Sequence, residues 1–262
     1  MLTSSLDMTE IPVIYSFARS GGTLVNQLLG VHPKCLVLSE INPAASFKPI
    51  AEQAVEWLGL LEEKEVKEFS HIPYYQQIKF LNDRAIAQKK KLIIRDWVTV
   101  NFLSGSAGYD IIPSRQLEQN LYLERVGFQP SPLVITRKGT DVYKSIRNSF
   151  LDLAELEMNN FAESYLEYAR AVAEFPIIHL EDLRSQPEVA LGKILHRFNI
   201  SCDDNDSLLQ NFFTFKNCTG NVSLKNENKS AVAQEILPPE KLAPTQNSHP
   251  YIVEANGILG YE

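Results

Sequence analysis

The sequence predicts a three-layer α/β/α fold, in which helices cover both faces of a central parallel sheet. Five runs rich in apolar and β-branched residues recur along the chain, at 11–17, 34–39, 91–95, 131–137 and 175–180. They are nearly continuous in apolar character, which is typical of strands buried on both faces. Segments with helical spacing of apolar residues separate these runs. Strands that alternate with helices indicate right-handed crossovers and parallel pairing.

The expected helices are the segments in which apolar residues recur at spacings of three and four, namely 22–31, 75–90, 114–126, 139–150, 159–173 and 187–198. From about Thr219 the chain becomes polar and rich in Pro and Asn. This composition predicts a long irregular segment over about 219–262, which would act as a lid or a tail. Residues 1–10 are expected to form a flexible N-terminus. The whole chain, 1–262, is therefore interpreted as one domain.

The composition narrows the class of protein. Of 262 residues, 44% are hydrophobic and 22% are charged, as in an ordinary globular protein. No apolar run approaches the roughly 18 residues that span a bilayer, and no export signal is recognisable, so a cytoplasmic protein without a membrane span is expected. The net charge of -7 argues against nonspecific nucleic-acid binding. The three cysteines are widely spaced, and neither a disulfide framework nor a metal site is indicated.

The stretch YSFARSGGTLVNQLL, residues 15–29, places a glycine turn between the first predicted strand and the first helix. In open parallel sheets this turn is the favoured anion site. Gly21 and Gly22 would let the backbone approach a ligand, while the N–H groups of Ser20 to Leu24 and the helix dipole favour a phosphate. Arg19 adds a planar cation. The alternative is a plain glycine turn with a surface arginine.

The turn lacks the lysine of a nucleotide triphosphate loop. Gly22 precedes Thr23 where the Walker pattern has Lys before Ser or Thr, so the usual groups for a γ-phosphate and magnesium are missing. Arg-Ser-Gly-Gly-Thr after a first strand resembles the 5′-phosphosulfate loop of the sulfotransferase family. The resemblance implies that residues 19–24 bind 3′-phosphoadenosine 5′-phosphosulfate (PAPS) without a required metal.

A second motif lies in PLVITRKGTDVYKSIRNS. Arg137 ends a predicted strand, and Ser145 follows eight residues later in a helix, which resembles the 3′-phosphate motif of sulfotransferases. The two side chains can converge on one anion, the guanidinium giving charge and the hydroxyl direction. The alternative is that Arg137 is a surface charge and Ser145 a small packing residue.

A third stretch, FPIIHLEDLRSQPEVALGKILHRFNI, resembles a later strand and amphipathic helix of the same family. Its expected role is architectural. Glu181 or Asp182 would cap a turn. The residues expected to form a buried helix face are Leu183, Leu191, Ile194, Leu195 and Phe198.

Sulfuryl transfer needs a base for the acceptor and a positive group near the departing nucleotide. Where soluble small-molecule sulfotransferases have Lys-x-His, this chain has Arg95-Asp96-Trp97, so the cation is kept and the histidine is missing. Tyrosylprotein and several carbohydrate sulfotransferases use a glutamate just after the second strand, and HPKCLVLSEINP puts Glu40 there. The resemblance implies that Glu40 is the base. The alternatives are that Glu40 is a solvated loop residue, and that Arg95 forms an ion pair with Asp96 or Glu40.

These motifs follow the family's order from residue 11 to about 200. The resemblance implies a P-loop NTPase-like sulfotransferase fold and transfer of a sulfuryl group from PAPS to a small-molecule, carbohydrate or peptide hydroxyl, or alternatively to an amine. Adenosine 3′,5′-bisphosphate (PAP) would be the product. Arg19, Glu40 and Arg95 would be catalytic. The cofactor would be bound by Arg19, Ser20, Gly21, Gly22, Thr23, Leu24, Arg137 and Ser145.

Several interpretations stay open. Trp97 and Phe102 are candidates for stacking on adenine or lining an acceptor pocket, or are core residues. The family's Arg-Lys-Gly loop is missing; Lys216 or Lys225 would substitute, or residues 218–226 form a solvated loop. The competing functions are a P-loop small-molecule kinase that uses ATP, and a noncatalytic nucleotide-binding member of the family. Some sulfotransferases dimerise, which leaves a homo-oligomer open, but no interface is identified.

Overall fold

The computed structural model describes residues 9–106, 111–150, 153–201, 209–220 and 249–261. Their centre is a five-stranded parallel sheet with the strand order β2-β3-β1-β4-β5. All five predicted strands are confirmed, as β1 (Glu10–Ser16), β2 (Cys35–Ile41), β3 (Lys91–Asp96), β4 (Gln129–Thr136) and β5 (Ile177–His179). Because all strands run the same way, their carboxyl ends meet at one edge of the sheet.

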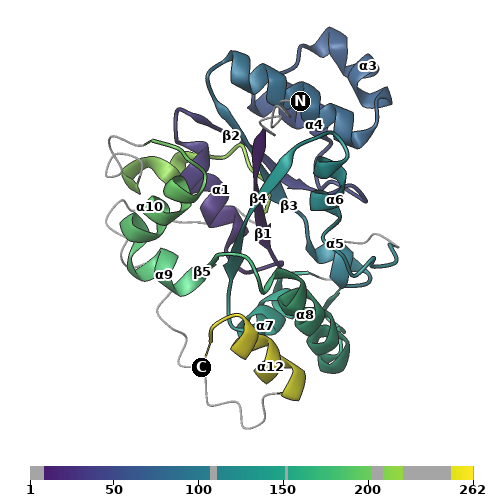
Figure 1. Ribbon diagram of the computed structural model, residues 1–262. Helices are drawn as coiled ribbons and strands as arrows, with labels where there is room; N and C mark the ends of the chain where they lie inside the picture. The colour runs from purple at the N-terminus through teal and green to yellow at the C-terminus, as the bar shows by residue number, and fades with distance from the viewer. Residues whose placement is uncertain (1–8, 107–110, 151–152, 202–208, 221–248, 262) are drawn as a thin grey trace, which may run out of the picture.

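Helices cover both faces of the sheet, which confirms the three-layer prediction (Figure 1). One face carries α1 (Gly22–Gly30), α9 (Leu180–Ser185) and α10 (Pro187–Arg197). The opposite face carries α4 (Tyr74–Ala87), α5 (Thr99–Phe102), α6 (Glu118–Glu124), α7 (Gly139–Ser149), α8 (Met158–Val172) and α12 (Pro250–Ile258). Each face has its own cluster of buried apolar side chains. No helix in these described ranges is both long and apolar enough to span a membrane.

Shorter elements fill the connections. After β2 come α2 (Ile50–Glu52), the π-helix η1 (Gln53–Trp57), the 3₁₀ turn η2 (Glu63–Glu65) and α3 (Val66–His71). A second 3₁₀ turn, η5 (Phe212–Thr214), packs beside α1. The six predicted helices are present with ends shifted by a few residues, whereas α2, η1, α3, α5, α9 and α12 were not predicted.

The prediction of an irregular segment over 219–262 is wrong at its end, where α12 forms. Pro250 occupies the first turn, and the His249 ring accepts a hydrogen bond from the Tyr251 N–H. Ile252 and Ala255 are fully buried against α8. Packing therefore stabilises a helix whose own hydrophobic pattern is weak. Residues 221–248, where a lid was considered, and residues 1–8 of the expected flexible N-terminus lie outside the described residues; Glu10 already belongs to β1.

The third motif packs into the core as expected. Its five predicted core residues are all buried in the cluster beneath α9 and α10. The predicted cap is wrong, because His179 stands at the N-cap and no side chain accepts a cap hydrogen bond there. Glu181 instead accepts a hydrogen bond from the Tyr261 hydroxyl at 2.8 Å.

Candidate functional site

A cavity of about 440 Å³ lies at the carboxyl ends of the strands. It is lined by residues at or after the ends of all five strands, and most of the site residues expected from sequence lie in it. These are Arg19, Gly21 to Leu24, Glu40, Arg95 and Arg137. Their positions after parallel strands explain this convergence, since such loops gather at one edge of the sheet.

The turn after β1 is packed too tightly for larger side chains. Gly21 has φ of 99°, and a Cβ there would lie 2.6 Å from Leu180 Cδ1. A Cβ on Gly22 would lie 2.4 Å from Ser16 Oγ. The Ala18 N–H donates to Thr99 Oγ1 at 2.8 Å, which ties the turn to α5. The two glycines are therefore needed for packing within the protein as well as for an open approach to the cavity.

The turn also presents free hydrogen-bond donors to the cavity. The N–H groups of Gly21 to Leu24 donate to no described residue. Ser20 differs from the expectation, because its N–H donates to the Phe17 carbonyl at 3.0 Å. Its hydroxyl is fully buried and has no partner among the described residues. These four N–H groups at the start of α1, which are unpaired among the described residues, favour an anion at this position.

Arg19 connects the first motif to the second. Its Nε donates to Ser145 Oγ on α7 at 3.0 Å. Burial lowers the pKa of Arg19, and the nearby charge of Arg137 lowers it further. Arg137 itself lies at the end of β4 with its Nε 4.0 Å from the Asp141 carboxylate. Ser145 is not among the residues that line the cavity. It is linked to the cavity through its hydrogen bond with Arg19.

Glu40 occupies a β-bulge near the end of β2. Ser39 lies opposite Arg95 and Ile41 lies opposite Asp96, so Glu40 is an extra residue without a partner on β3. Its φ of 49° is uncommon for a residue other than glycine. Bulges change the direction in which a side chain points, and strained residues cluster at functional sites. Here the bulge places Glu40 in the cavity lining with its side chain 24% exposed.

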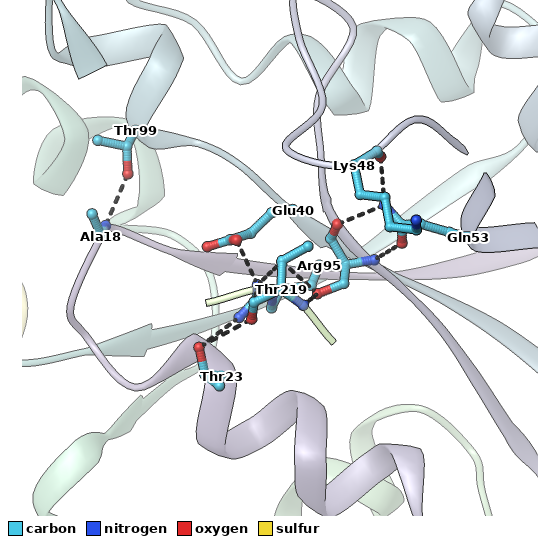
Figure 2. Close-up of polar contacts among 9 residues, drawn as sticks. Ala18, Thr23, Glu40, Lys48, Gln53, Arg95, Thr99 and Thr219 are labelled. Atoms are coloured by element: carbon cyan, nitrogen blue, oxygen red, sulfur yellow. Dashed lines mark hydrogen bonds and ion pairs between the residues drawn. The ribbon is translucent and has the colours of Figure 1, made fainter. Parts of the chain in front are cut away.

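The Arg95 guanidinium lies beside Glu40 and is only 2% exposed (Figure 2). The two side chains form an ion pair of 3.1 Å. Arg95 also donates to Thr219 Oγ1 at 2.6 Å and to Thr23 Oγ1 at 3.3 Å. Of the two ion pairs considered for Arg95, the structure contains the one with Glu40. The Arg95 Nε has no partner among the described residues.

Thr219 was not anticipated as a site residue. Cys218 and Thr219, the first residues of the stretch considered as a solvated loop (218–226), are buried, while residues 221–226 lie outside the described residues. The Thr219 N–H donates to Ser39 Oγ at 3.0 Å. Gly220 follows with φ of 104°, and a Cβ there would lie 2.2 Å from Thr23 Oγ1. Lys216 is exposed and outside the cavity lining, while Lys225 lies outside the described residues. A short buried segment thus closes over Arg95.

Aromatic side chains line another part of the cavity. Trp97 is buried and packs edge to face against Phe47, with ring centroids 5.7 Å apart. Phe47 is 54% exposed, and Phe150 and Leu153 add further apolar surface. The interpretation of Phe102 as a pocket residue is wrong, because that side chain is fully buried in the core.

Asp96 is separate from the cavity. Successive residues of a strand point to opposite faces, so the side chain next to Arg95 is directed into the other layer. The Asp96 carboxyl is 1% exposed, and Asn42 Nδ2 donates to both of its oxygens at 3.2 Å. Burial raises the pKa of Asp96 well above its ordinary value.

We expect Asp96→Asn to stabilise the protein at neutral and alkaline pH, with a benefit that shrinks as the pH falls toward about 4. Because the folded-state pKa is raised, the folded protein keeps a proton that the unfolded chain has already released. Stability therefore falls as the pH rises from the unfolded pKa to the folded pKa, by at most about 1.4 kcal/mol per pH unit. Urea unfolding of both proteins across this pH range checks the result. Parallel curves would contradict it.

Comparison with solved structures identifies the fold. No protein-family model matches the sequence, and no curated protein matches it. The sulfotransferase domain from the Synechococcus PCC 7002 olefin synthase is 16% identical over 100% of this chain and 99% of that chain, with a TM-score of 0.62. The sulfotransferase domain from the curacin biosynthetic pathway is 16% identical over 97% and 99%, with a TM-score of 0.63. Mouse sulfotransferase SULT7A1 complexed with PAP is 14% identical over 78% and 64%, with a TM-score of 0.42.

Proposed function

We propose that this chain, which has the sulfotransferase fold, transfers a sulfuryl group from PAPS to an acceptor hydroxyl and releases PAP. One observation carries the proposal. Glu40 and Arg95 line the same cavity as the Gly21-Gly22 turn and Arg137. A base, a cation and an anion-binding turn at one site are the groups that this transfer needs.

The residues present fit a polyanionic nucleotide. The N–H groups of Gly21 to Leu24 are unsatisfied among the described residues, and the buried Ser20 hydroxyl lacks a partner. Arg19 and Arg137 line the same cavity. An anion with several oxygens would satisfy these donors and reduce the repulsion between the arginines. When bound, PAPS would supply an activated sulfuryl group attached to a phosphate leaving group.

Each end of the nucleotide has its own set of residues in this proposal. Arg19 and the N–H groups of Gly21 to Leu24 hold the 5′-phosphate and the sulfuryl oxygens. Arg137 and Ser145 hold the 3′-phosphate. Ser145 Oγ accepts from Arg19, so its own hydroxyl hydrogen stays available to a phosphate oxygen.

The ion pair gives Glu40 and Arg95 linked roles. Arg95 orients the Glu40 carboxylate, which takes the proton of the acceptor hydroxyl as that oxygen attacks. Arg95 Nη1 lies 3.2 Å from the position of a Cβ on Gly22, close to the start of α1. From there its charge offsets the negative charge that develops on the bridging oxygen of the nucleotide. The acceptor would rest against Phe47 and Trp97, near Glu40.

Sulfuryl transfer from PAPS tests the proposal directly. The purified protein is incubated with PAPS that carries radioactive sulfur and with phenols, aliphatic alcohols, sugars, tyrosine peptides and amines, with and without a magnesium chelator. We expect label in a hydroxyl product and an equal amount of PAP, both insensitive to the chelator. Magnesium-dependent phosphoryl transfer from ATP would support a kinase instead. Binding of PAPS without transfer to any of these acceptors would support a noncatalytic protein.

A further inference from the structure

Arg184 is a fourth arginine in the cavity lining; it lies in the third motif, for which the sequence predicted only an architectural role. It lies on α9 and is partly buried. It forms no hydrogen bond or ion pair with any residue that the structure describes. A partly buried cation that lines a cavity without a hydrogen-bond partner among the described residues is unusual, because the charges of Glu181 and Asp141 offset only part of its desolvation.

Strand pairing explains why Arg184 lies near Arg137. Thr136 of β4 is opposite His179 of β5, so the segments that follow these two residues start side by side. Arg137 comes directly after Thr136, and Arg184 lies in α9, which begins directly after His179. A Cβ on Gly21 would lie 2.6 Å from Leu180 Cδ1, so the start of α9 also lies against the anion-binding turn.

Positive charge is concentrated at the part of the cavity lined by Arg19, Arg137 and Arg184. Burial lowers the pKa of Arg184, and the charge of Arg137 lowers it further; the same charge acts on Arg19. Carboxylates offset part of this charge: Asp141 and Glu181 act on Arg184, and Glu40 acts on Arg19, but the pKa of both arginines stays lowered. The positive charges of Arg19, Arg137 and Arg184 therefore repel one another in the free protein, and a bound dianion would relieve this repulsion.

We propose that Arg184 is a ligand of the nucleotide 3′-phosphate, together with Arg137 and Ser145. The inference rests on the proposed function and extends it. The family's Arg-Lys-Gly loop on the 3′-phosphate is missing from the sequence, and Arg184 on α9 would supply a contact in its place. It also assigns a selectivity to the cavity. A nucleotide with a 3′-phosphate gains the Arg184 contact, whereas 5′-AMP occupies only the turn after β1.

Calorimetric titration of Arg184→Gln with PAP and with 5′-AMP tests this assignment. We expect the PAP affinity to fall about 10- to 100-fold, as for the loss of a charge-assisted hydrogen bond, and the 5′-AMP affinity to change less than about twofold. Arg184→Lys keeps the charge but not the planar fork, so its PAP affinity should be intermediate. Lys193→Gln, which removes one exposed charge from neighbouring α10, serves as the control and should match the wild type.

The outcomes separate this inference from the proposed function. Suppose that the wild type binds PAP. If Arg184→Gln then binds PAP equally well, or loses affinity for PAP and 5′-AMP by the same factor, the proposed role of Arg184 is wrong and the proposed function stands. Wild type that does not bind PAP overturns both. Thermal unfolding of the free proteins gives a second readout. Because Arg184 is repelled by Arg137, Arg184→Gln should not lower the Tm, and a lowered Tm with equal loss of both nucleotides would indicate a structural role.

Discussion

Glu40→Gln is expected to lower the turnover number about 100- to 10,000-fold while leaving PAP affinity within a few-fold of the wild type. Glutamine keeps the size and the hydrogen-bonding oxygen of the side chain, but it cannot take a proton from the acceptor. The nucleotide contacts come from the turn after β1 and from Arg137, so they are retained. Steady-state kinetics with the accepted hydroxyl substrate, together with calorimetry of PAP, separates the two effects.

The matched control for Glu40 is Glu52→Gln, which removes a carboxylate that is outside the cavity lining and paired with Lys48. Its turnover should equal that of the wild type. If Glu40→Gln retained full turnover, the carboxylate would only orient Arg95. If it lost turnover and PAP affinity together, the change would have disturbed the whole site.

Arg95→Met is expected to abolish measurable transfer and to lower the free energy of unfolding by about 3 kcal/mol, as when one member of a buried pair is removed. The guanidinium is 2% exposed, and its loss leaves the Glu40 carboxylate and the Thr219 hydroxyl without their strongest partner. Glu40 is 24% exposed, so water compensates part of the loss. Urea unfolding and the transfer assay provide the two measurements.

Two further variants show how the effect of Arg95 arises. Arg95→Lys keeps a charge but cannot contact Glu40, Thr23 and Thr219 together, so we expect partial stability and low activity. The double variant Glu40→Gln with Arg95→Met removes both charges. Its stability loss should be smaller than the sum of the two single losses, because the single Arg95 change leaves an unpaired carboxylate. Additive losses would contradict a direct interaction between the two groups.

The sequence predicted the sheet and the region of the site because both depend on local patterns. Five apolar runs identified the strands. The resemblance to sulfotransferases pointed to Arg19, Glu40, Arg95 and Arg137, and these four residues line one cavity because they lie at or just after strand ends that meet at one edge of the sheet. Ser145 was predicted to bind an anion, which stays a prediction; the structure adds that its Oγ accepts a hydrogen bond from Arg19. Helical spacing cannot reveal which polar neighbour a side chain chooses.

Other parts of the site depend on long-range packing that local patterns do not encode. The bulge at Glu40 is defined by the register between β2 and β3. Thr219 accepts a hydrogen bond from Arg95, which is 124 positions away in the sequence. Arg184 lines the cavity because β5 pairs with β4. Phe102 and Trp97 looked alike in sequence, yet one lies in the core and the other in the cavity lining. Helix α12 was missed because tertiary contacts, more than its own pattern, stabilise it.

Calorimetric titration with PAP, and separately with ATP and magnesium, tests the nature of the cavity most directly. We expect the wild type to bind PAP tightly and ATP weakly, because the turn lacks the lysine and magnesium ligands of a triphosphate site. Arg137→Ala should weaken PAP binding about 10- to 100-fold, since it loses a charge-assisted contact with the 3′-phosphate. Binding of ATP with magnesium but not of PAP, or PAP affinity unchanged in Arg137→Ala, would contradict a sulfonucleotide site.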